Sequence, residues 1–200
     1  MSALPTDSRP LSPFGEAALK YARLGFAVFP CKPRGKEPLT THGFKDATDD
    51  EAQIRAWWAR WPNANIGLLT GRGSGLFVVD PDSEKAEGFL ARLEARFGKL
   101  PPTSESTTGR GRHLVFSLPE GCGPVPSSAE DGLDIRADGG YIIAPPSIHP
   151  NGKTYEWNED SPRQFAEAPR WLLDFARDRK AVLKALDGPT AAGGGKGTRG

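Results

Sequence analysis

The sequence predicts an α+β fold with a mixed, largely antiparallel sheet and flanking helices. Apolar residues recur at helical spacing in the first half of the chain, whereas short alternating runs between turns follow Pro101. The 24 glycines and 19 prolines among 200 residues indicate many tight turns. Helices packed on one or both sides of a sheet would bury both kinds of element.

Each predicted helix combines apolar residues three or four positions apart with a start or stop signal. Gly25 ends the first helix, Asp49 or Asp50 caps the second, and Pro62 stops it. The third helix shows this spacing at Phe89 and Leu93. The fourth helix shows it in the apolar residues near the end of the chain. The helices are expected over residues 14–24, 51–61, 83–98 and 169–186.

Strands are predicted where short apolar or alternating runs are bounded by turn residues. They are expected over residues 26–30, 65–69, 76–80, 103–108, 113–118, 133–136, 141–144 and 154–157. The run from Leu76 to Val79 is wholly apolar, which places it in the middle of a sheet. Pro145 and Pro146 end the strand before them, because proline cannot continue a ladder.

The chain divides into one domain and two tails. We expect a flexible N-terminal tail over residues 1–13, one catalytic domain over 14–187, and a Gly-rich linker or the end of an expressed fragment over 188–200. No apolar run reaches the ~20 residues of a membrane span, and no signal peptide is apparent. We therefore expect a cytoplasmic protein without a membrane partner.

Charge and cysteines narrow the classes of function. The net charge of +1 does not by itself indicate a nucleic-acid binder. One loop gathers four basic residues, Lys32, Arg34, Lys36 and Lys45. They are candidate DNA contacts, and a solvated basic loop is the alternative. Cys31 and Cys122 match no metal-ligand spacing, which excludes a Cys-rich zinc site.

The central motif is the pair of acids at the end of the strand 76–80. Side chains alternate along a strand, so Asp80 and Asp82 are expected on one face. Two carboxylates there repel each other unless something neutralises them, and a divalent metal ion is the usual answer. The alternative is a simple turn in which Asp82 caps the following helix.

Two later stretches supply further candidates. Residues 109–113 form a Gly-rich basic turn whose backbone N–H groups, with Arg110, Arg112 and His113, are able to hold an anion; a solvated turn is the alternative. Asp134 and Arg136 alternate with apolar residues, so they face either the same site as Asp80 or solvent as an exposed pair.

Trp57, Trp58 and Trp61 recur at helical spacing and are interpreted as core residues.

These stretches in this order resemble the primase–polymerase (Prim-Pol) domain of the archaeo-eukaryotic primase superfamily. The resemblance covers roughly residues 14–175 and rests on the following segments: Phe77-Val78-Val79-Asp80-Pro81-Asp82, Gly109-Arg110-Gly111-Arg112-His113-Leu114-Val115-Phe116, Gly132-Leu133-Asp134-Ile135-Arg136, Gly139-Gly140-Tyr141 and Ala144-Pro145-Pro146-Ser147. The upstream part is similar to the N-terminal half of the same domain in these segments: Ala17 to Pro30, Gly35-Lys36-Glu37-Pro38-Leu39, Trp57-Trp58 and Asn65-Ile66-Gly67 through Thr70-Gly71.

The resemblance implies a catalytic fold of the RRM-like primase type and a metal site. Asp80, Asp82 and Asp134 match the family's acids, which hold two Mg²⁺ or Mn²⁺ ions. Gly111-Arg112-His113 matches the motif whose histidine contacts the nucleotide phosphates. Many relatives carry Ser where this chain has Gly111, which removes one hydroxyl contact. Relatives are often fused to a helicase or to a helical domain.

The resulting expectation is a template-directed nucleotidyltransferase, a DNA polymerase with DNA primase activity left open. Its substrates would be a single-stranded DNA template, a primer and dNTP or NTP. Candidate triphosphate ligands are His113, Arg112, Gly111, Arg136 and Arg72. Two alternatives remain: a non-catalytic DNA- or nucleotide-binding replication module, and a metal-dependent nuclease.

Overall fold

The computed structural model describes residues 10–130 and 133–188. The helices are α1 (Pro13–Arg23), the 3-10 helix η1 (Gly43–Asp46), α2 (Glu51–Arg60), α3 (Glu84–Phe97), α4 (Arg170–Arg177) and α5 (Arg179–Asp187). The strands are β1 (Val28–Cys31), β2 (Asn65–Leu69), β3 (Leu76–Pro81), β4 (Ser104–Thr107), β5 (Arg112–Ser117), β6 (Ser128–Glu130), β7 (Leu133–Arg136), β8 (Tyr141–Ala144) and β9 (Glu156–Trp157).

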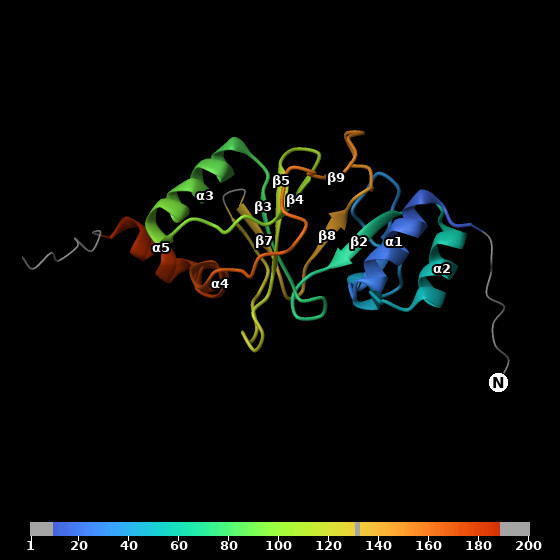
Figure 1. Ribbon diagram of the computed structural model, residues 1–200, viewed down its shortest axis with the longest axis horizontal. Helices are drawn as coiled ribbons and strands as arrows, with labels where there is room; N and C mark the ends of the chain where they lie inside the picture. The colour runs from blue at the N-terminus through green and yellow to red at the C-terminus, as the bar shows by residue number, and fades with distance from the viewer. Residues whose placement is uncertain (1–9, 131–132, 189–200) are drawn as a thin grey trace, which may run out of the picture.

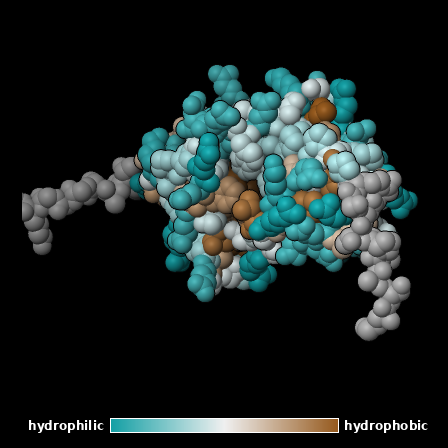
Figure 2. Space-filling view, turned by 45° about the vertical axis from the view of Figure 1, so that its right-hand side comes forward, coloured by the Kyte–Doolittle hydropathy of each residue, from teal (hydrophilic) through white to brown (hydrophobic). Residues whose placement is uncertain are grey.

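The strands form two sheets rather than one, and the α+β prediction is confirmed. A three-stranded sheet has the order β1-β2-β8, and a six-stranded sheet has the order β6-β7-β3-β5-β4-β9. Every pair of neighbouring strands is antiparallel. Helices α3, α4 and α5 lie on one side of the larger sheet, and α1, α2 and the smaller sheet lie on the other (Figure 1). Figure 2 shows a mostly hydrophilic surface with apolar residues gathered in a hollow near its middle.

Strand β3 is buried on both faces because its side chains alternate between two cores. Phe77 and Val79 belong to the cluster that includes α3 and α4. Leu76 and Val78 belong to the cluster that includes α1 and α2. This alternation continues to Asp80, which therefore lies on the side of the three-stranded sheet.

Side-chain caps define where the helices begin. Ser12 accepts a hydrogen bond from Gly15 N, and Asp50 accepts from Ala52 N at 2.8 Å. Ser83 accepts from Ala86 N at 3.2 Å and is the N-cap of α3. Asp82 is thus not the cap of α3, so the predicted capping role of Asp82 is wrong.

Several elements differ from the sequence prediction. The single helix expected over 169–186 is two helices, because Asp178 leaves helical geometry (φ −140°, ψ 75°) and caps α5 by accepting from Ala181 N. The strand expected over 154–157 is reduced to β9. Strand β6 and helix η1 formed within predicted turns or loops.

The predicted tails fall largely outside the described residues, although Pro13 already belongs to α1. Across residues 10–130 and 133–188, the longest apolar helical stretch falls short of what a bilayer crossing requires.

Candidate active site

Three strands bring the candidate residues to the centre of the larger sheet. Asp80 on β3 pairs in register with Asp134 on β7. On the other side of β3, Val79 pairs with Leu114 of β5, which places His113 next to Asp80. Because the side chains alternate, Asp80, Asp134 and His113 share one face of the sheet. Asp80 therefore lies between a second carboxylate and an imidazole.

His113 is buried and held from two sides. Its Nε2 lies 3.7 Å from Asp80 Oδ2, and its Nδ1 lies 3.4 Å from Ser106 Oγ. Burial acts to raise the pKa of Asp80, but the hydrogen bond and charge of His113, with Lys36 and Arg136, hold that pKa below its ordinary value. Asp80 is therefore ionised near neutral pH.

Asp134 lies near two other carboxylates and near Arg136. Burial raises its pKa above the ordinary value; the charges of Asp80 and Asp82 raise it further, although Arg136 opposes them. Arg136 contacts the Asp134 carboxylate directly. Asp82 lies beyond the end of β3 and is exposed, yet its charge reaches Asp134. Three carboxylates thus concentrate negative charge at this end of β3.

A cavity of about 140 Å³ opens beside these residues. Its polar lining consists of Lys36, Asp80, His113, Arg136, Tyr141 and Tyr155. Tyr155 stacks on His113 with ring centroids 6.1 Å apart, and burial raises the pKa of Tyr155 to about 12, so the hydroxyl stays protonated. One carboxylate, Asp80, and two cations, Lys36 and Arg136, meet in this cavity, so it offers charges of both signs to a ligand.

The carboxylates of Asp80 and Asp134 are of the kind that bind a hard divalent cation, although the part of the chain that the structure describes does not bring enough ligands close together to hold one. In residues 10–130 and 133–188, no group of three or more His, Cys, Asp or Glu side chains is close enough to hold a metal ion. Asp80 and Asp134 nevertheless offer carboxylate oxygens from directly opposed strand positions, and their mutual repulsion favours a cation between them. Arg136 neutralises Asp134 in this structure.

Arg112 is not brought to the cavity. It precedes His113 on β5, so its side chain faces the opposite side of the sheet, where α3 packs. There it forms a bidentate pair with Glu87 at 2.7 and 3.0 Å and contacts Glu105 at 3.0 Å. These two carboxylates raise the pKa of Arg112 and occupy its donors. The assignment of Arg112 to triphosphate binding therefore does not fit the structure.

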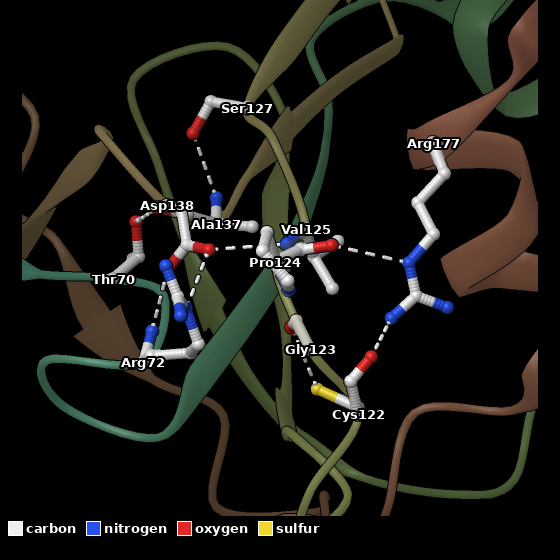
Figure 3. A network of polar contacts seen from close by, with 10 residues as sticks. All are labelled: Thr70, Arg72, Cys122, Gly123, Pro124, Val125, Ser127, Ala137, Asp138 and Arg177. Carbon is white, nitrogen blue, oxygen red and sulfur yellow. Dashed lines mark hydrogen bonds and ion pairs between the residues drawn. The ribbon is translucent and has the colours of Figure 1, made fainter.

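Arg72 is also placed elsewhere. It lies in the turn before β3, at the end of that strand opposite to Asp80. Its backbone N and its Nε donate to Asp138 at 2.8 and 2.9 Å, and Asp138 accepts a third bond from Val125 N (Figure 3). Arg72 belongs to a structural network that joins the β2–β3 turn to the end of β7.

Gly111 contributes by its small size rather than by a free backbone donor. The N–H groups of Arg110 and Gly111 donate to Thr108 Oγ1, so the predicted backbone anion site is not formed. A Cβ at Gly111 would overlap the carbonyl oxygen of Pro81 and approach Asp82 Cα to 3.2 Å. The turn that carries His113 therefore packs directly on the backbone between the two acids.

Replacing Gly111 by alanine is expected to destabilise the fold by about 1–3 kcal/mol, because the added methyl group must displace the Pro81 backbone. Thermal unfolding measures this loss. Gly88→Ala is the matched control, since Gly88 lies within α3 with open space around it; alanine there should stabilise by about 0.5–1 kcal/mol. Equal melting temperatures for the two variants would contradict the packing account.

The predicted basic loop separates into two parts. All four basic residues are exposed, but of these only Lys36 also lines the cavity, where it influences the pKa of both Asp80 and Asp134. The loop is anchored there because Tyr141 Oη donates to Lys36 O at 3.0 Å. Sequence reasoning treated Lys36 only as a weak DNA contact.

Sequence reasoning missed Tyr141 and Tyr155 as cavity residues. Tyr141 lies in a segment that was interpreted as structural, and Tyr155 lies outside the motifs. Both reach Asp80 only because the smaller sheet and the segment before β9 pack next to it. Of the three predicted core tryptophans, Trp58 is fully buried, whereas Trp57 and Trp61 are only half-buried.

Comparison with known proteins yields one family. The model of Prim-Pol, described as bifunctional DNA primase/polymerase, N-terminal, matches residues 18–171. This range contains every strand of both sheets and all the residues that line the cavity. No curated protein matches the chain.

Proposed function

Because this chain belongs to the Prim-Pol family of bifunctional DNA primase/polymerase N-terminal domains, we propose that it is a DNA polymerase that extends a primer on a single-stranded template. Family membership makes it a nucleotidyltransferase-type enzyme with DNA and nucleotide substrates. The observation that carries the finer proposal is the direct pairing of Asp80 with Asp134 on neighbouring strands, next to His113. Asp80 and His113 line a cavity together with Lys36 and Arg136.

Asp80, Asp82 and Asp134 would hold the divalent ions, Mg²⁺ or Mn²⁺. When bound, such ions lower the pKa of a primer 3′-hydroxyl and neutralise charge on the phosphates. His113 presents Nε2 on the side of Asp80 and would donate to a phosphate oxygen. Lys36 and Arg136 would neutralise the rest of the triphosphate, with Arg136 moving from Asp134 to the incoming phosphates.

Primer extension tests the proposal. A labelled primer on a longer template, with Mn²⁺ or Mg²⁺ and one dNTP at a time, should lengthen only with the nucleotide complementary to the next template base. Omission of dNTP should leave the primer intact, whereas shortening would indicate the nuclease alternative. Binding of DNA without extension in either metal would indicate the non-catalytic module.

Lys36→Ala is expected to raise the KM for dNTP about tenfold, since a charge-assisted contact to phosphate is lost. Steady-state extension at varied dNTP measures it. Lys20→Ala, an exposed lysine on α1, is the matched control and should leave the KM unchanged. An unchanged KM in Lys36→Ala would remove Lys36 from the proposed nucleotide site.

A further inference from the structure

A second hollow lies between α2 and the loop that precedes it, with a volume of about 780 Å³. We propose that this groove, lined by Thr40, His42, Trp57, Arg60 and Trp61 and here called the tryptophan groove, binds bases of the single-stranded DNA template. The choice of template DNA as occupant rests on the proposed polymerase function. The groove itself shares no lining residue with the cavity beside Asp80.

Two tryptophans lie in α2 and a third, Trp61, is its C-cap, and they differ in burial. Trp58 is buried, and its indole N–H donates to Ala64 O at 3.2 Å. Trp57 and Trp61 are half-buried and line the groove, and neither indole N–H has a hydrogen-bond partner among the described residues. Both rings pack partly against the apolar core, and the part of each that lines the groove offers an aromatic surface for stacking on bases.

Arg60 extends the stacking surface. Its guanidinium lies 4.5 Å from the centroid of the Trp61 ring, in cation–π geometry. Guanidinium planes and indole rings both stack on bases with little dependence on sequence. Because the Arg60 guanidinium covers one face of the Trp61 ring, a base would stack on the outer face of this guanidinium–indole pair at the end of α2.

The acids of the groove indicate that bases, rather than phosphates, occupy it. Asp46 accepts from His42 N at 2.9 Å and faces His42 Nδ1 at 2.8 Å, and Asp50 caps α2. Both carboxylates would repel phosphate groups. The exposed cations of the neighbouring loop, Lys32, Arg34 and Lys45, are able to follow the backbone outside the groove.

The groove and the candidate active site adjoin one another. Lys36 lines the cavity, and the same loop lines the groove from Leu39 onward. Trp57 packs in the same apolar cluster as Tyr141 and Tyr155, both of which line the cavity. A strand of DNA with bases on Trp57 and Trp61 would therefore pass close to the site that holds the nucleotide.

Fluorescence anisotropy with a labelled oligo(dT) tests the inference. Trp61→Ala and Arg60→Ala should each weaken binding roughly five- to a hundredfold, with the salt dependence unchanged, because stacking releases no counterions. Trp61→Phe should recover most of the affinity. Lys45→Ala should instead lower the salt slope by about 0.7. Arg170→Ala, an exposed arginine on α4, is the matched control and should bind as wild type.

Wild-type affinity in folded Trp61→Ala and Arg60→Ala would overturn the inference. If wild type still extended primers, the polymerase proposal would stand without it. Conversely, tryptophan-dependent DNA binding in a protein that extends no primer would support the groove and contradict the polymerase proposal.

Discussion

Asp134→Asn is expected to lower the rate of primer extension at least about a hundredfold without destabilising the protein. The neutral amide is a poor ligand for a divalent ion, so the metal-dependent step is lost. The stability of the folded state should not fall, because burial and the charges of Asp80 and Asp82 disfavour the ionised Asp134 carboxylate that the substitution removes. The asparagine carbonyl is still able to accept from Arg136.

Extension rates and thermal unfolding of the same preparation measure the two effects together. Asp160→Asn is the matched control, since this exposed acid lies beyond β9 and away from the cavity, and neither quantity should change. A variant that retains activity, or one that loses activity only because it unfolds, would contradict the role proposed for Asp134.

Phe77→Ala is expected to reduce the free energy of unfolding by about 3–5 kcal/mol. Phe77 is completely buried on β3, in the core that packs against α3 and α4, and its removal leaves a cavity beneath the strand that carries Asp80. For a domain of this size the melting temperature should fall by roughly 6–20 °C.

Thermal or denaturant unfolding measures this loss. Leu24→Ala is the control, since Leu24 is 70% exposed and its truncation should change stability by less than about 0.5 kcal/mol. A Phe77→Ala protein as stable as Leu24→Ala would show that β3 is not the central strand of the fold.

The sequence predicts most elements because their signals are local. The apolar run of β3 and the alternation in β7 give strand bounds close to those observed. The register between β3 and β7 then places Asp80 and Asp134 on one face, and this pairing is not readable from either strand alone. The break at Asp178 was missed because the apolar spacing continues across it. The division into two sheets was missed because pairing between distant strands leaves no local signal.

The sequence identifies the acidic residues of the candidate site better than its basic residues. Arg112 was misplaced because its partners, Glu87 and Glu105, come from other elements, and strand alternation turns it away from His113. Lys36 and Tyr155 reach the cavity only through tertiary packing. Trp57 and Trp61 follow the helical spacing of core residues, yet the loop before α2 leaves a groove over them.

The most direct test compares wild type with Asp80→Ala/Asp82→Ala in primer extension with Mn²⁺, with circular dichroism on both proteins. Both acids lie at the end of β3, and Asp82 is exposed, so the double variant should stay folded. The account predicts template-directed extension by wild type and none by the folded double variant. Extension by the folded double variant at the wild-type rate would contradict it.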